Sequence, residues 1–208
     1  LDVPDDDTVA AVVIGVATIG RSTSAGYVGG HAGGTTWPGT SNVNVSPSEV
    51  RANMLVVPVG GNGGISLRAF QIADVAVDVL GYVTSDDAGV SGSGLYNTIA
   101  PTRSVDTRVP VGASRLGPLA SVETDTPAAT AGASAVAQNI TVTNTAGPGW
   151  ASAHPGPVAP VVSNVNYDGP FHTRAAFAFT TVSSSDSIYF TSLVATDLVV
   201  DVVGFFSD

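Results

Sequence analysis

The chain carries the stretch Asp-x-x-Val-Asp-Val-x-Gly-aromatic twice, as Asp74-Val75-Ala76-Val77-Asp78-Val79-Leu80-Gly81-Tyr82 and as Asp197-Leu198-Val199-Val200-Asp201-Val202-Val203-Gly204-Phe205. In both copies apolar side chains recur at every second position, the period of a β-strand with one buried face. A second motif, Ser41-Asn42-Val43-Asn44, returns as Ser163-Asn164-Val165-Asn166. Self-similarity with so long a period indicates two whole domains in tandem, each with its own core.

The composition indicates an all-β protein that does not bind nucleic acid. With 208 residues, 44% hydrophobic and 12% charged, and with 24 glycines, the chain is too apolar for disorder and too glycine-rich for a mainly helical fold. Seven arginines and no lysine stand against 17 carboxylates, for a net charge of −10. Nucleic acids and anionic membranes both require a basic surface, so we expect neither as a partner.

Two further absences limit the chemistry. Without cysteine there are no disulfides and no thiolate metal sites. The apolar runs are shorter than the ~20 residues that span a bilayer, so we expect no membrane insertion. The chain begins at Leu1 without an initiator methionine, as a mature chain does after removal of a secretory signal and as a trimmed chain also does.

The sequence predicts two antiparallel β-sandwich modules, jelly-roll-like, joined by a linker. We place module one at residues 1–83, a flexible Gly- and Ser-rich linker at 84–94, and module two at 95–208. In module two, residues 95–134 precede the first shared strand, whereas module one has only residues 1–11 there. Module one is therefore predicted to lack its opening strands.

The shared strands of module one are the more apolar ones. On the 123-residue spacing, Val12, Ile14 and Val16 stand where module two has Ala135, Ala137 and Asn139, and Leu55 and Val57 stand where it has Ala178 and Thr180. A truncated sandwich with open edges and extra apolar surface aggregates unless another protein covers it. We therefore predict that Val12, Ile14, Val16, Leu55 and Val57 form an assembly interface.

Module two closely resembles a known but uncharacterised repeat of secreted and cell-surface proteins of high-GC bacteria. The resemblance lies in the opening Pro101-Thr102-Arg103-Ser104-Val105-Asp106-Thr107-Arg108, in Gly147-Pro148-Gly149-Trp150, and in the closing Gly204-Phe205-Phe206. Residues 95–206 match a whole unit, and residues 9–83 match its last two thirds, without the opening signature. The resemblance implies a secreted, wall-associated or filamentous role, sometimes beside hydrolase domains.

The charged residues of the two signatures are the candidate functional groups. Asp197 and Asp201 lie four apart on one strand and so face the same side. A paired-carboxylate glycoside hydrolase would use them as acid and base, but ~13 Å along a strand is wider than such pairs require. We therefore expect a structural role, in which an arginine binds these carboxylates bidentately and locks the first strand onto the last; the candidates are Arg103, Arg108 and Arg174, with Asp106 beside them.

In module one, Asp74 and Asp78 remain, but Arg103 and Arg108 have no counterpart. Arg51 is the candidate partner within the module. The alternative is a partner chain that donates a strand carrying the missing groups.

The sequence favours structural or solvent-exposed roles for the remaining candidates. His31, His154 and His172 are scattered and predict hydrogen bonds at loops, not a zinc site. Asp5-Asp6-Asp7 and Asp86-Asp87 lack the spaced ligands of a Ca²⁺ loop and indicate a solvated terminus and linker. Tyr27, Trp37 and Trp150 are the candidates for stacking on a sugar, although a core position is the simpler interpretation for Tyr27 and Trp150.

The leading hypothesis is a non-enzymatic extracellular structural subunit that needs no cofactor and self-assembles head to tail into a filament, pilus-like fibre or sheath. Strand or edge complementation of module one would make the contact. The alternative is a carbohydrate- or cell-wall-binding module of a secreted protein. A stand-alone hydrolase that uses the paired aspartates is the weakest option.

Overall fold

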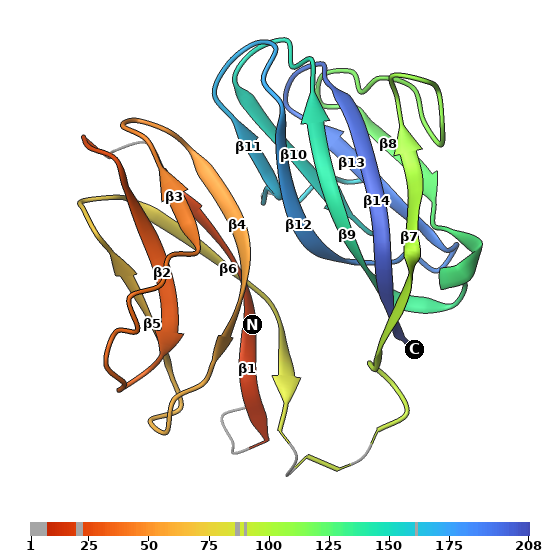
Figure 1. Cartoon of the computed structure of the whole chain (residues 1–208). Coiled ribbons are helices and arrows are strands. Elements are labelled where there is room, and N and C mark those ends of the chain that lie inside the picture. The colour runs from red at the N-terminus through yellow and green to blue at the C-terminus, as the bar shows by residue number, and fades with distance from the viewer. Residues whose placement is uncertain (1–7, 20–22, 86–87, 90, 161) are drawn as a thin grey trace. The chain divides into compact units, whose positions relative to one another are not determined.

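The computed structural model describes residues 8–19, 23–85, 88–89, 91–160 and 162–208. The chain divides into two compact units, Leu1–Val90 and Ser91–Asp208, and the division falls inside the segment 84–94. Both units are built from antiparallel strands, which confirms the all-β prediction (Figure 1). No helix in the described ranges is long and apolar enough to cross a membrane.

Module two has eight strands in two four-stranded sheets. One sheet has the order β12-β9-β14-β7 and the other the order β11-β10-β13-β8. This is the strand order of a jelly roll, in which the first strand lies beside the last. The strands, with one short 3-10 turn (Ala128–Thr130), are β7 (Tyr96–Asp106), β8 (Ser121–Asp125), β9 (Ala133–Thr143), β10 (Gly149–His154), β11 (Val165–Tyr167), β12 (Arg174–Thr181), β13 (Ser187–Ser192) and β14 (Asp197–Ser207).

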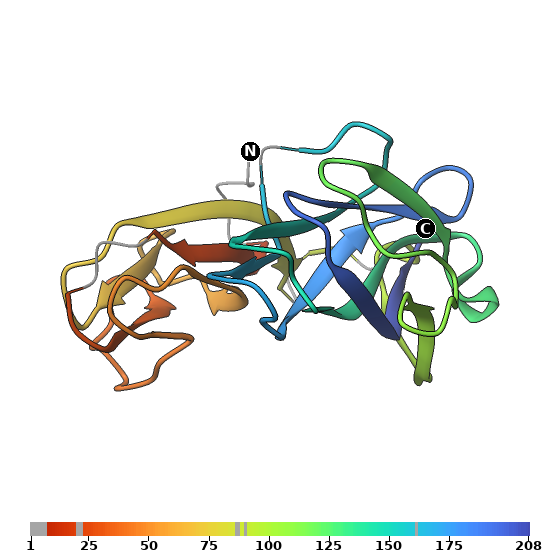
Figure 2. The ribbon, with the colours of Figure 1, turned by 90° about the horizontal axis from the view of Figure 1, so that it is seen from above.

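The core of module two lies between its sheets. On β9 the alternation predicted from the sequence is confirmed, because Val136, Ile140 and Val142 are at most 1% exposed. Ala151 and Phe190 close the core from the opposite sheet. The first two strands contribute as well: Figure 2 shows the green segments β7 and β8 against the blue strands β14 and β13, with which they pair.

The described residues of module one form the last six strands of the same sandwich. Its sheets have the orders β4-β1-β6 and β3-β2-β5, which match β12-β9-β14 and β11-β10-β13. The counterparts of β7 and β8 are missing, so β6 and β5 become edge strands among the described residues. The six strands are β1 (Val9–Thr18), β2 (Gly26–Ala32), β3 (Val43–Val45), β4 (Arg51–Pro58), β5 (Ile65–Ala69) and β6 (Val75–Thr84).

Strand pairing corrects the sequence alignment of β1 with β9 by one residue. Ala17 pairs with Ala76, and Thr141 pairs with the equivalent Val199, so the offset here is 124. Val12, Ile14 and Val16 therefore correspond to Val136, Gln138 and Ile140. One polar pair distinguishes the two cores: the Gln138 amide donates to Thr180 Oγ1 (2.9 Å), where module one has Ile14 and Val57.

We call residues 96–125, which contain β7, the loop after it and β8, the opening segment of module two. Truncating one buried side chain of this segment should destabilise module two alone. Leu116 is 1% exposed in that module's core. Leu116→Ala should lower the free energy of unfolding of module two by about 2–5 kcal/mol, because it removes a buried side chain and leaves a cavity. Each module has one tryptophan, Trp37 or Trp150, so urea unfolding followed by fluorescence in Trp37→Phe and Trp150→Phe backgrounds separates the two transitions.

The matched control is Val109→Ala, in the same segment but 62% exposed. It should shift neither transition by more than about 0.5 kcal/mol. An equal loss in both variants, or a shift of the module one transition in Leu116→Ala, would contradict the proposed role of the opening segment.

Candidate functional site

In module two the opening signature locks β7 onto β14. The Arg103 guanidinium donates to both carboxylate oxygens of Asp201, from Nε (2.6 Å) and from Nη2 (3.1 Å), and its Nη1 reaches Asp106 Oδ2 (3.0 Å). Arg108 holds Asp106 from the other side, with Nε to Oδ1 at 2.8 Å and Nη2 to Oδ2 at 2.7 Å. The predicted bidentate lock between the first and last strands is therefore present for Arg103 and Asp201.

This arrangement strongly favours the ionised form of Asp106. Hydrogen bonds from Arg108 and its backbone N–H, with the nearby charges of Arg108 and Arg103, hold the pKa of the Asp106 carboxyl far below its ordinary value, although burial opposes the shift. The same contacts raise the pKa of Arg108. Asp106 is therefore a fixed anion between two cations and is unsuited to act as a general acid near neutral pH.

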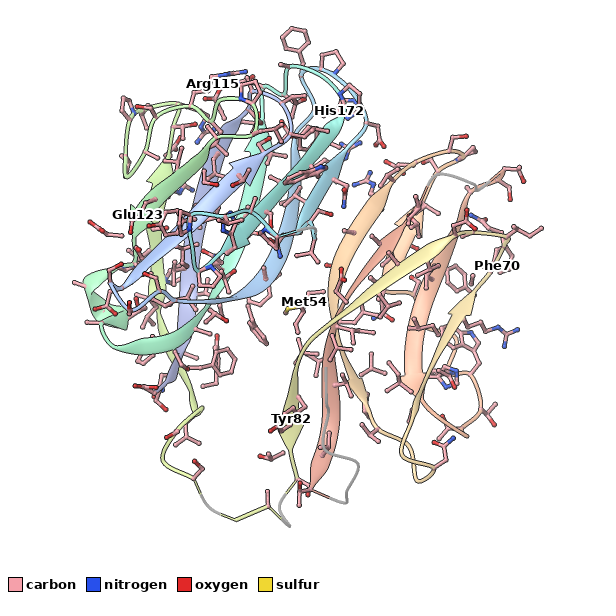
Figure 3. The ribbon with its side chains drawn as sticks, turned by 180° about the vertical axis from the view of Figure 1, so that it is seen from behind. Met54, Phe70, Tyr82, Arg115, Glu123 and His172 are labelled. Carbon is pink, nitrogen blue, oxygen red and sulfur yellow. The ribbon has the colours of Figure 1, made fainter. Side chains whose placement is uncertain are left out.

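Asp197 is held by a residue that the sequence did not single out. Arg115, in the loop between β7 and β8, donates from Nη1 to Asp197 Oδ2 (2.8 Å) and from Nη2 to the Asn144 carbonyl (2.6 Å). Thr107 Oγ1 and Asn144 Nδ2 complete the shell at 2.9 Å each. Figure 3 shows Arg115 at the end of module two where β14 begins.

Arg174 and Arg51 are not the predicted partners. Arg174 lies 4.0 Å from Asp168 and donates to the Thr173 carbonyl, so its proposed pairing with Asp197 or Asp201 is wrong. Arg51 forms an ion pair with Glu49 at 2.7 Å. It begins β4, which β1 separates from β6, so it does not pair with Asp78.

The equivalent position in module one is open. Asp78 on β6 is the counterpart of Asp201, is half-buried, and makes no side-chain hydrogen bond or ion pair in the described part of the chain. Asp74 stands before β6, where its carbonyl accepts the Ile19 N–H (2.8 Å). The closing strand thus keeps the acidic group of the lock without an arginine on Asp78.

Matched apolar positions show the same difference. Val77 of β6 is 42% exposed, whereas its equivalent Val200, paired with Val105, is 0% exposed. On the other sheet Leu67 of β5 is 36% exposed, whereas Phe190, paired with Val122, is 2% exposed. We call the surface formed by Val77, Leu67, Leu80 and Tyr82 with Asp78 the open side of module one; Figure 3 labels Tyr82 on it.

The five residues predicted as an assembly interface lie elsewhere. Val12, Ile14, Val16, Leu55 and Val57 are at most 9% exposed and form the module's own core with Val28, Val43 and Val45. That prediction is wrong, because these five side chains of β1 and β4 face the second sheet of the same module. Leu67 of β5 and Val77, Leu80 and Tyr82 of β6 are exposed instead, and Val56 on the outer face of β4 is exposed as well.

An aromatic strip of Tyr27, Trp37 and Phe70 lies on the outer face of the β3-β2-β5 sheet. Tyr27 stacks on Trp37 and on Phe70, with ring centroids 6.3 and 5.3 Å apart. A core position for Tyr27 is wrong, because its neighbour Val28 fills the core and Tyr27 faces outward. Phe70, labelled in Figure 3, is 68% exposed, and the Arg68 guanidinium lies 5.8 Å from the Trp37 ring centroid.

Module two has no equivalent strip in its described residues. Trp150 takes the place of Tyr27, half-buried outside the core cluster, and no aromatic ring in that part of the chain stacks on it. Leu193 takes the place of Phe70. Tyr27 and Trp37 are two of the three candidates that the sequence predicts for stacking on a sugar, whereas Phe70 is not predicted because it lies outside the repeated motifs.

The histidines form no metal site within the described residues. His31 contacts Thr35 Oγ1 (3.2 Å), His172 accepts the Asp168 N–H (3.4 Å), and His154 is buried, with Nε2 2.9 Å from Thr191 Oγ1. Burial lowers the pKa of His154. Within the described ranges no three His, Asp or Glu side chains gather as metal ligands. Asp5-Asp6-Asp7 and Asp86-Asp87 lie outside the described residues.

Comparisons with protein-family models, with curated proteins and with solved structures find no match to this chain. The resemblance to the secreted bacterial repeat therefore stays a prediction.

The lock makes module two sensitive to acid. A carboxyl whose pKa is lowered by folding stabilises the fold above its unfolded pKa, about 4, and loses that contribution as the pH falls further. Asp106→Asn should therefore be less stable than wild type at pH 7 and should lose less stability between pH 7 and pH 3. Urea unfolding followed by Trp150 fluorescence at the two pH values measures the difference.

Glu123, whose pKa is lowered chiefly by a hydrogen bond from Ser187, contributes in the same direction and remains in the variant. Asp125→Asn, at an exposed carboxyl of β8, is the control and should keep the acid sensitivity of wild type. If Asp106→Asn lost as much stability between pH 7 and pH 3 as wild type, the ion pairs of Asp106 would not be the source of the acid sensitivity.

Proposed function

We propose that the chain is a non-enzymatic structural subunit of an extracellular assembly, joined head to tail to its neighbours through the open side of module one. The observation that carries this proposal is the pair of matched positions, Val77 and Val200, at 42% and 0% exposure. Edge strands template pairing with other chains, and soluble proteins ordinarily block them. Here β6 presents apolar side chains on an unpaired edge, which suits a contact surface.

The surroundings of the aspartates support a structural role over a catalytic one. Arg103 occupies both oxygens of Asp201, and Arg115, Thr107 and Asn144 surround Asp197. A general acid needs a proton to give, and a general base needs a free lone pair near substrate. These carboxylates instead hold neighbouring strands together. They stabilise the fold, as a structural subunit requires.

Lysine on β6 should prevent assembly without unfolding the module. In about 0.5 M salt, where repulsion from the net charge of −10 is screened, the wild-type chain should form dimers and larger species as its concentration rises. Val77→Lys and Tyr82→Lys place a charge at positions already 42% and 46% exposed, and both variants should remain monomeric. Light scattering after gel filtration gives the mass, and negative-stain microscopy distinguishes rings from filaments.

Val158→Lys, at an 85% exposed position of module two, should assemble like wild type. Trp37 fluorescence reports whether module one stays folded in each variant. A wild-type chain that remains monomeric at every concentration, or β6 variants that assemble normally, would count against self-assembly through this side.

The aromatic strip supports a second candidate function, binding to a cell-wall glycan. Sugar rings stack on exposed aromatic faces, and Phe70 presents such a face beside Tyr27 and Trp37. Phe70→Ala should reduce retention of the chain on insoluble peptidoglycan or chitin at least several-fold in a pull-down. Phe171→Ala removes an aromatic ring that is 84% exposed in module two and should not change retention. Equal retention of both variants, or none of wild type, would exclude this function for the strip.

A further inference from the structure

We propose that the open side of module one receives the opening segment of another repeat unit, an extended strand of the β7 type whose arginine binds Asp78. This inference rests on the proposed function, which places a neighbour on that side, and it names the chemistry of the neighbour. Module two is the template, because it shows the same sandwich with the segment in place.

The template fixes which side chains the incoming strand carries. Arg103 lies opposite Asp201 and Val105 opposite Val200, and Ser104 between them is a bulge. The bulge allows two residues of the same parity to face opposite sides: Arg103 binds the carboxylate outside, and Val105 enters the core. In module one the equivalent targets are Asp78 and Val77, which lack these two partners.

A glycine on each closing strand marks the path of the same segment. A Cβ at Gly204 would collide with the Tyr96 ring and hydroxyl, so glycine is required there for β7 to pass. Gly81 is its counterpart on β6, and a Cβ at Gly81 would meet nothing within 4 Å. Module one therefore holds free the space that a tyrosine at the start of an incoming strand needs.

Charge favours an arginine-bearing strand over a second β6. This strand has Asp78 and contains no basic residue, and the chain carries a net charge of −10. Pairing two β6 edges brings like charges together. An incoming arginine instead satisfies Asp78 with charge-assisted hydrogen bonds.

Among the described residues, no further strand is left to pair with the free edge of β6. The described chain has two closing strands that accept an opening segment, β6 and β14, but one segment of the β7 type, and that segment is paired with β14. If one copy donated this segment to β6 of an identical copy, its own β14 would lose its partner strand. The partner that completes the edge is therefore a repeat unit whose opening segment is free, because a contact between copies that each keep β7 on β14 brings Asp78 no arginine of this type.

A synthetic peptide with the sequence of residues 96–125 tests the inference on the full chain. Fluorescence anisotropy of the labelled peptide should show saturable binding. Asp78→Asn should weaken that binding about ten-fold, because a charge-assisted pair is lost. The matched variant Asp201→Asn should not weaken it, and a peptide with Arg103→Gln should bind wild type about ten-fold less tightly. Hydrogen exchange should show new protection in residues 75–84 of β6.

Absence of binding, equal binding to wild type and Asp78→Asn, or protection confined to β14 would overturn the inference. Asn has the shape of Asp, so Asp78→Asn should keep the wild-type unfolding transition of module one. The outcomes separate the two proposals. If the chain stays monomeric but binds the peptide at β6, self-assembly is contradicted and the donor-strand proposal is supported. If the chain self-assembles but does not bind the peptide, self-assembly is supported and the donor-strand proposal is contradicted.

Discussion

The pairing of the first strand with the last is the contact on which the rest of this architecture depends. In a jelly roll these strands are far apart in the sequence, and their pairing places the next strand, β8, on the edge of the opposite sheet. Val105 and Leu116 then seal the core of module two. Among the described residues, module one has the remaining six strands and a smaller core around Ile14, and the edges at β6 and β5 leave apolar side chains exposed.

Arginine suits this contact for geometric reasons. The planar guanidinium of Arg103 spans both oxygens of Asp201 and also reaches Asp106, which a single ammonium group cannot do in a fixed orientation. Because Asp106 is 4% exposed, its charge requires this compensation, and Arg108 completes it. The four residues form one network, so the acidic closing strand and the basic opening segment depend on each other.

Much of this architecture could be predicted from the sequence, because the chain contains its own comparison. The sequence predicts the sandwich and a bidentate arginine–carboxylate bond between the first and last strands, but not which of Arg103, Arg108 and Arg174 makes that bond. The one-residue shift of β1 could not be found, because an alternating strand looks similar in either register until its partners are known. Arg115 lies in a loop 82 residues from Asp197, and no local pattern links such residues. Likewise, apolar composition alone could not show that Val12 and Leu55 face inward.

The bulge at Ser104 restricts the register in which such a strand can pair. If a strand of this type slid by one residue along a closing strand, its guanidinium would turn toward the core and its valine toward water. Burying an arginine without a carboxylate is strongly unfavourable. The free-energy difference between the correct and the shifted register is therefore larger for this strand than for a strand with apolar residues alone. The arginine, the bulge and the valine thus act as a key that fits one alignment, and subunits joined in this way would share a single spacing.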